Sequence, residues 1–285
     1  MGDNSAIEWT NATWNPTTGC TKISSGCKNC YAERLSPKLK RWGIKKYVNN
    51  FEFTQHESEL RLPLKWKKPK KIFVNSMSDL FHEKAEMGFI EKSFMTMFAA
   101  DWHTYQILTK RPDKMVEFSR MFNKLFGFPI PSHIWMGTSV ENNSTLFRID
   151  ELRKVKCYSR FVSFEPLLEK LENINLENID WAIIGGESGP NYRAVREEWV
   201  LDLIKQCKKQ KVSIFFKQWG GPRPKSGGRI IRGKTYNEYP KSKKLKNLHK
   251  KKFDRLKSTL ADSFENRESA SSNLRITPIV EILHD

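Results

Sequence analysis

The stretch "KIFVNSMSDLFHE" (71–83) begins with an apolar run and ends in a cluster of polar side chains. The run 71–76 is rich in β-branched and aromatic residues, which predicts a strand buried on both faces. The stretch that follows, 83–100, carries apolar residues at three- and four-residue steps, which predicts a helix. A buried strand followed by a helix is the unit from which parallel sheets are built.

The same unit recurs along the chain. Further strands are predicted at "YQILTK" (105–110), "HIWMGTS" (133–139), "RFVSFEP" (160–166), "DWAIIGG" (180–186) and "VSIFFKQW" (212–219). Helices are predicted between them at 112–125, 143–155 and 196–210. This alternation predicts an α/β fold with a parallel sheet, either doubly wound or closed into a complete or partial barrel. No G-x-G-x-x-G opens a helix, which counts against a dinucleotide-binding sheet.

Polar residues follow every predicted strand. In parallel α/β folds, function collects at the carboxyl ends of the strands. The residues at these ends are Ser76, Ser78, Asp79, Lys110, Arg111, Thr138, Ser139, Glu141, Glu165, Gly185, Gly186, Glu187 and Lys217. On one rim the carboxylates of Asp79, Glu165 and Glu187 would lie beside three cations, which suits a zwitterionic ligand with several hydroxyl groups. The cations are Lys110, Arg111 and Lys217. The two glycines allow close backbone approach or a positive φ.

Three of the five cysteines, Cys20, Cys27 and Cys30, form a C-x6-C-x2-C cluster. A structural zinc site takes four ligands, and His56 or His82 would have to be the fourth, because the other two cysteines lie far along the chain in segments that look like core. An iron–sulfur cluster held by three thiolates instead leaves one iron open to a ligand. S-adenosylmethionine (SAM), a radical cofactor, can chelate such an iron through its amino and carboxylate groups.

The stretch "GC…GCKNCYAER" resembles the cluster loop of the radical SAM superfamily. The usual spacing there is C-x3-C-x2-C, so this chain has three extra residues between Cys20 and Cys27. It also has Asn29 where an aromatic residue normally precedes the last cysteine. Most of the chain to about Pro240 resembles an uncharacterised family labelled as phage-derived, three-cysteine-motif proteins. The matching stretches are "IEWTNATWNPTTGC", "NSMSDLFHE", "ILTKRP", "GTSVEN", "SFEPLL", "IIGGESGPNYR", "FFKQWGG" and "GKTYNEYP".

The resemblance implies a partial (β/α)6-type barrel with the cluster loop after its first strand. Cys20, Cys27 and Cys30 would bind a [4Fe-4S] cluster. SAM contacts are expected from Tyr31, Ser76, Ser78, Asp79, Thr138, Ser139 and Glu141. Substrate or rim contacts are expected from Lys110, Arg111, Glu165, Gly185, Gly186, Glu187 and Lys217. The implied reaction is reductive cleavage of SAM to a 5′-deoxyadenosyl radical that abstracts hydrogen from a substrate, with a flavodoxin- or ferredoxin-type electron donor.

The chain is strongly basic, with 50 Lys and Arg against 32 Asp and Glu and a formal net charge of +18. Such an excess favours polyanions, so the expected substrate is DNA, RNA or a nucleotide that is modified or repaired. A candidate nucleic-acid surface is "KWKKPKK" (65–71), which combines a stacking aromatic with cations. Its residues are Lys65, Trp66, Lys67, Lys68, Lys70 and Lys71.

We expect a cytoplasmic protein with reduced thiols and no membrane partner, because no secretory h-region and no apolar run of about 18 residues is present. The predicted organisation is a barrel domain at 1–240 followed by a lysine-rich, solvated or disordered tail at 241–285. Two alternatives stay open. One is a non-enzymatic nucleic-acid-binding protein with a zinc-stabilised loop, and the other is a hydrolase or transferase that uses the rim carboxylates.

Overall fold

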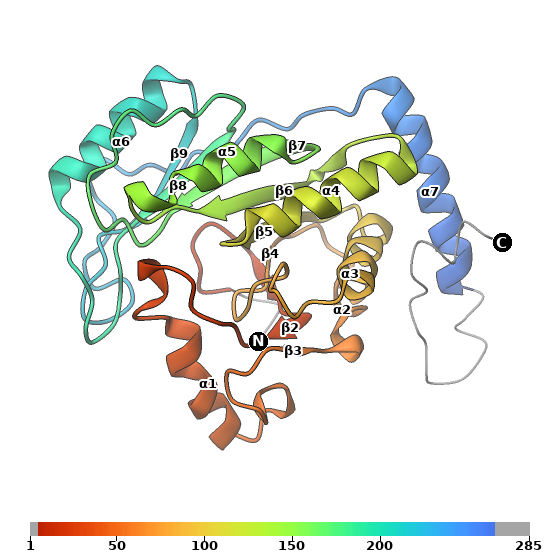
Figure 1. Ribbon diagram of the computed structural model, residues 1–285, viewed down its shortest axis with the longest axis horizontal. Coiled ribbons are helices and arrows are strands. Elements are labelled where there is room, and N and C mark those ends of the chain that lie inside the picture. Colours follow the sequence, from red (N-terminus) through yellow and green to blue (C-terminus); the bar gives the residue numbers. More distant parts are fainter. Residues whose placement is uncertain (1–4, 266–285) are drawn as a thin grey trace.

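The computed structural model describes residues 5–265, and its centre is one curved sheet of seven parallel strands (Figure 1). The strands are β1 (Ala12–Trp14), β4 (Lys71–Val74), β5 (Thr104–Thr109), β6 (Ile130–Ser139), β7 (Cys157–Phe164), β8 (Trp181–Gly185) and β9 (Ser213–Gln218). Their order in the sheet follows their order along the chain. In a doubly wound sheet the order of the strands reverses part-way across the sheet. The observed order does not reverse, so the partial barrel is confirmed. The additional strand, β1, is only three residues long and was not predicted from its composition.

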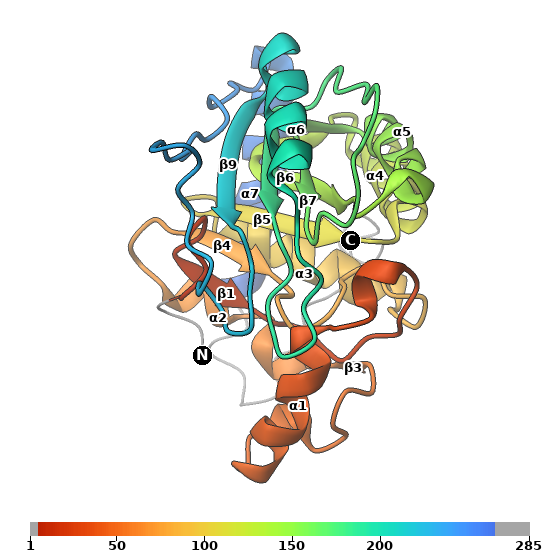
Figure 2. The same cartoon turned by 90° about the vertical axis from the view of Figure 1, so that its left-hand side faces the viewer.

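Helices connect most successive strands along the outer face of the sheet (Figures 1 and 2). They are α3 (Met87–Ala99), α4 (Pro112–Phe126), α5 (Phe147–Lys154) and α6 (Glu197–Lys209). Helix α4 begins with Pro112, whose missing N–H costs nothing in the first turn, and is capped by Gly127 at a φ of 67°. The main core lies between these helices and the sheet, with aromatic contacts such as Phe94 to Phe118 at 4.3 Å between ring centroids.

The inner, concave face of the sheet carries an aromatic cluster. Trp181 is fully buried at its centre, with ring centroids 5.6 Å from Trp135 and 5.7 Å from Phe161. Gly137 pairs with Phe161 in the register, and a Cβ at this glycine would lie 2.5 Å from the Phe161 ring. Trp135 and Phe161 stand near the middle of β6 and β7, and Trp181 is the first residue of β8. The inner positions nearer the carboxyl ends are polar, as in the register pair Ser139–Ser163.

The segment between β1 and β4 leaves the sheet and carries the cysteines. It contains β2 (Thr17–Thr18), which pairs antiparallel with β3 (Thr54–Gln55), and the helices α1 (Tyr31–Arg41) and α2 (Leu62–Lys65). Helix α1 buries Ala32 and Leu39 in a small separate cluster with Tyr47 and Met77. Both views show α1 projecting from the body of the molecule (Figures 1 and 2).

The lysine-rich segment after residue 240 differs from the expected solvated tail. Residues Asn247–Glu265 form helix α7, which packs against α3. Phe253, Leu256 and Leu260 are buried, and the Phe253 ring lies 5.9 Å from the Phe98 ring. Their spacing of three and four residues gives the helix an apolar face that the many lysines conceal in the composition. The remainder of the predicted tail, 266–285, lies outside the described residues. Among the described helices, none combines the length and hydropathy that a membrane span requires.

Candidate functional site

The three clustered cysteines lie on the loop between β2 and α1, and each thiol is free and partly exposed. Gly19, just before Cys20, has a φ of +77°, and a Cβ there would lie 2.1 Å from the Glu52 carbonyl oxygen. This turn therefore requires glycine. Cys27 ends a short 3-10 turn, and Cys30 is the N-cap of α1. The other two cysteines, at positions 157 and 207, are buried in the main core as predicted.

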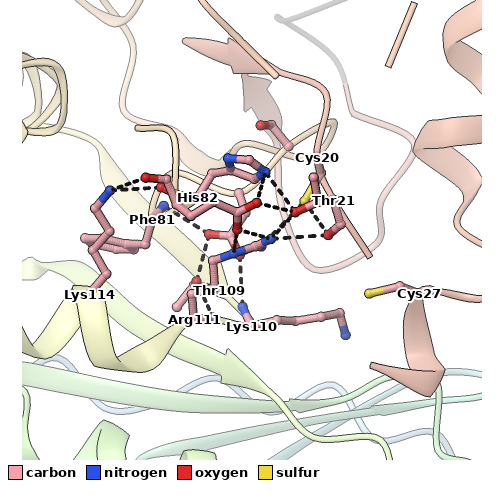
Figure 3. Close-up of polar contacts among 12 residues, drawn as sticks. Cys20, Thr21, Cys27, Phe81, His82, Thr109, Lys110, Arg111 and Lys114 are labelled. Atoms are coloured by element: carbon pink, nitrogen blue, oxygen red, sulfur yellow. Dashed lines mark hydrogen bonds and ion pairs between the residues drawn. The ribbon is translucent and has the colours of Figure 1, made fainter. Parts of the chain in front are cut away.

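Arg111, which directly follows β5 and Lys110, reaches the first cysteine. Its Nη1 donates to Cys20 Sγ at 3.6 Å, and its Nη2 donates to the Thr21 hydroxyl at 2.7 Å (Figure 3). Nε donates to Glu83 Oε2 at 3.0 Å. Burial and the Asp79 carboxylate raise the pKa of the Cys20 thiol to about 11, while Arg111 lowers it. Arg111 is thus the cation that opposes the cost of a thiolate at Cys20.

Asp79 holds Arg111 in place. Its Oδ2 accepts from Arg111 Nη1 at 3.3 Å and from the Lys110 amide at 3.1 Å. Its Oδ1 accepts from the Thr109 hydroxyl at 2.7 Å and from the Phe81 amide at 3.0 Å. Both oxygens of this buried carboxylate are therefore engaged by the chain itself, which makes Asp79 an orienting group for Arg111. Its role toward the SAM amino group stays a prediction.

The two histidines considered as zinc ligands are engaged elsewhere. His82 Nδ1 accepts from the Lys84 amide at 3.2 Å, so the neutral ring carries its proton on Nε2, which lies 3.1 Å from the Thr21 hydroxyl. Burial and the nearby Arg111 lower the pKa of His82. His56 Nε2 lies 2.8 Å from the Thr18 hydroxyl. In the part of the chain that the structure describes, no three His, Cys, Asp or Glu side chains are arranged to hold one metal ion.

A second cation, Lys110, serves Cys27 (Figure 3). Burial raises the pKa of the Cys27 thiol, but the Lys110 ammonium and backbone hydrogen bonds at Ile23 and Ser24 outweigh it, so the pKa lies below its ordinary value. The Ser24 hydroxyl lies 3.7 Å from Cys27 Sγ. Consecutive residues after β5 therefore direct positive charge at two of the three thiols.

Lys110 is itself held by Glu141, a fully buried carboxylate beyond the end of β6. Glu141 Oε1 also accepts from the Ser24 hydroxyl at 3.0 Å, and Oε2 accepts from Arg148 Nη1 at 3.0 Å. Burial raises the pKa of Glu141, but Lys110 and Arg148 more than reverse this and keep it ionised. The loop approaches this carboxylate so closely that a Cβ at Gly26 would lie 2.4 Å from Glu141 Cγ.

The loop after β8 grips the other side of the cysteine loop. Glu187 Oε2 accepts from Asn29 Nδ2 and from Arg193 Nε, both at 2.9 Å. Arg193 Nη1 donates to the Ser25 carbonyl at 3.0 Å, and Asn29 Nδ2 also reaches the Asn191 carbonyl at 2.7 Å. We call Glu187, Arg193 and Asn29 the β8 clasp. Sequence reasoning did not predict that Asn29 and Arg193 pair with Glu187. The expected contact of Glu187 with substrate or the adenosyl group stays a prediction.

The remaining rim residues are Glu165, Lys217, Gly185 and Gly186. Glu165 and Lys217 form an ion pair of 2.8 Å, and the Ser163 hydroxyl donates to Glu165 at 3.0 Å. Gly185 lies close by, since a Cβ there would be 2.9 Å from Glu165 Oε1. A Cβ at Gly186 would lie 2.0 Å from the Trp219 carbonyl oxygen.

Several predicted SAM contacts make hydrogen bonds within the chain. The Ser78 hydroxyl donates to the Gly19 carbonyl at 2.6 Å, and the Thr138 hydroxyl donates to the Thr109 carbonyl at 2.9 Å. The Tyr31 hydroxyl donates to the Ser76 carbonyl. The Ser76 hydroxyl donates to Asn15 Oδ1 at 3.2 Å, and the buried Ser139 offers its carbonyl to Arg148 at 2.9 Å.

The basic stretch 65–71 lies at the opposite ends of the strands from the cysteine loop. Lys71 is the first residue of β4, and its Nζ lies 4.2 Å above the Tyr239 ring, which stacks on Trp181 at the start of β8. The Trp66 carbonyl accepts from Trp102 Nε1 at 2.8 Å. This stretch therefore adjoins the amino ends of the strands, whereas the cysteine loop adjoins their carboxyl ends.

Residues 4–240 match a family described as protein of unknown function (DUF5131). The chain belongs to the DUF5131 family. No curated protein matches this DUF5131 chain. Among solved structures it is similar to a chain titled spore photoproduct lyase Y98F mutant, with 12% sequence identity and a TM-score of 0.36. That likeness covers 93% of this chain and 76% of the other. The phage-derived grouping stays a prediction, because the family description gives no source.

Proposed function

We propose that this DUF5131 protein binds a [4Fe-4S] cluster through Cys20, Cys27 and Cys30 and acts as a radical SAM enzyme. The observation that supports this is one loop beside the carboxyl ends of the strands that presents three accessible thiols, with Lys110 and Arg111 directed at two of them. A cluster with three thiolate ligands keeps one iron for another ligand.

The donor set fits such a cluster. Each iron takes one thiolate, so the sulfurs surround a volume instead of meeting at one point, as a single ion would require. Three thiolates on an iron–sulfide core carry net negative charge, and the structure supplies compensating cations from the residues after β5. The lowered pKa of the Cys27 thiol favours its thiolate, whereas the pKa of the Cys20 thiol is raised.

When bound, the cluster and SAM would supply a 5′-deoxyadenosyl radical by one-electron reductive cleavage, with methionine as the other product. The chain's own residues would bind and orient. Arg111 would donate a hydrogen bond to the Cys20 sulfur, and such bonds are among the factors that set a cluster's reduction potential. The Glu165–Lys217 pair offers an anion and a cation for the charged end of SAM. The electron would come from a flavodoxin- or ferredoxin-type donor.

Anaerobic reconstitution with iron and sulfide, followed by SAM and dithionite, tests the proposal. The expected result is about four irons and four sulfides per chain and formation of 5′-deoxyadenosine. Cys27→Ala should lose both, while the matched control Cys157→Ala, in the core, should keep both. Zinc without iron in oxygen-free protein would overturn the proposal and favour the zinc-stabilised binding protein. A hydrolase or transferase would keep its activity in Cys27→Ala if the variant folds.

A further inference from the structure

Helix α1 and the turn after it form an exposed surface that is both basic and aromatic. We call Lys38, Lys40, Arg41, Trp42 and Lys45 the α1 surface, and all five are exposed. Trp42 is 61% exposed, and Lys38 Nζ lies 4.7 Å from the centroid of its ring. Residues 31–50 contain six Lys and Arg but a single acidic residue, Glu33.

From this surface we infer that the protein binds single-stranded nucleic acid along α1 and that α1 leads the strand to the cysteine loop. The inference rests on the proposed function, because it names the substrate class of that site. Unpaired bases stack on exposed aromatic rings, and nearby cations contact the phosphates.

The fold itself does not account for this surface. The packed side of α1 is made by other residues, including Ala32 and Leu39. Lys40, Arg41 and Lys45 make no ion pair within residues 5–265. Glu33, the one acid nearby, pairs with Lys22 at 2.7 Å. The cations are thus available to a polyanion such as a nucleic acid, and their charge disfavours an apolar or basic partner.

The position of the surface links it to the site. Helix α1 starts immediately after Cys30, and its 11 residues span about 16 Å at about 1.5 Å per residue. Trp42, its C-cap, follows Cys30 by 12 residues and therefore stands about 18 Å from that cysteine, with Lys38 and Arg41 on the same helix. Figure 1 shows α1 at the lower left and α7 at the right, and the cysteine loop leads directly from β2 into α1. The stretch 65–71, at the amino ends of the strands, has no such link to the triad.

Fluorescence anisotropy with labelled single-stranded DNA and RNA oligonucleotides, titrated over salt on the reconstituted full chain, tests the inference. The charge variant is K40Q/R41Q/K45Q. Its matched control is K65Q/K67Q/K68Q, which removes three lysines near the amino ends of the strands. The α1 variant should lose tenfold or more in affinity, and its slope of log K against log salt should fall by about two. Trp42→Ala should lose about fivefold or more through lost stacking with an unchanged salt slope.

Other outcomes overturn the inference. It fails if K65Q/K67Q/K68Q loses as much affinity as the α1 variant, or if neither oligonucleotide binds. It also fails if the α1 variant loses binding to phosphatidylserine vesicles but not to oligonucleotides, which would identify a lipid surface. Formation of 5′-deoxyadenosine without nucleic acid reports the proposed function separately. The α1 variant should still form 5′-deoxyadenosine. If the wild type forms none, the proposed function fails, whereas unchanged oligonucleotide binding in the α1 variant contradicts only this inference.

Discussion

The β8 clasp makes a quantitative prediction about the order of the cysteine loop. Glu187 is 7% exposed and accepts hydrogen bonds from Asn29 and Arg193. Burial raises the pKa of Glu187, but the hydrogen bonds from Arg193 and Asn29 lower it below its ordinary value of 4.5, so it is ionised at neutral pH. Glu187→Gln keeps the shape of the side chain but removes the charge and brings an amide N–H toward donors.

The size of the effect follows from these contacts. Hydrogen bonds to a charged group contribute about 1.5–3 kcal/mol, against about 0.5–1.5 for neutral ones. The Arg193 side chain is 31% exposed, so solvent screens part of its contribution. We therefore expect the clasp to lose about 2 kcal/mol, which opens the loop about 30-fold more often. Because the pKa is depressed on folding, this stabilisation is present above about pH 4.5 and is lost as pH falls through the folded-state pKa.

Hydrogen exchange followed by mass spectrometry on the metal-free chain measures the opening directly. The amides of Cys27 and Lys28 donate to the Ser24 and Ser25 carbonyls and report on the loop. Their exchange should be about 30-fold faster in Glu187→Gln. The control is Glu198→Gln, an exposed residue whose carboxylate lies 3.8 Å from Arg196. Exchange at the wild-type rate in Glu187→Gln would refute the reasoning.

Three further predictions concern other parts of the molecule. Burial lowers the pKa of His133 from 6.5 to about 4, so the free energy of unfolding should rise by up to about 3 kcal/mol between pH 4 and 6.5, and thermal melts of His133→Gln should lack this rise. Leu260→Ala should cost about 2–4 kcal/mol in urea unfolding, and a loss under about 0.5 would show that α7 is not docked. Lys110→Gln should raise the pKa of the Cys27 thiol, seen as slower alkylation of the Cys27 peptide at pH 7, and an unchanged rate would contradict the charge argument.

Much of the sheet was predictable because buried parallel strands are continuous apolar runs. The run 105–110 became β5 at Thr104–Thr109, and the run 212–219 became β9 at Ser213–Gln218. Strand β1 was not predictable in this way, since Ala12–Trp14 is too short to show a pattern. Helix α7 was not predicted because its three buried apolar residues are outnumbered by lysines. The stability that they contribute depends on the aromatic surface of α3 that they cover, which the sequence of α7 does not show.

The candidate site was predictable in location but less so in its internal pairing. Parallel topology alone brings Lys110, Glu141 and Glu187 together at the carboxyl ends of the strands. It does not say which partner each takes, because that depends on contacts across long stretches of sequence. Asn29 and Glu187 are 158 residues apart, and no local pattern links them.

The six residues between Cys20 and Cys27 help to explain how the rim is used. Ordering a longer loop costs more conformational entropy, so the loop needs more contacts to become ordered. Ser24 and Ser25, within this longer stretch, receive them from Glu141 and Arg193. The rim acids therefore have different roles, and Glu141 and Glu187 order the loop through contacts with the chain itself. Glu165 pairs with Lys217 and Ser163 at the rim and makes no hydrogen bond or ion pair with the cysteine loop in the described part of the chain, so we expect it to be the acid that meets a ligand.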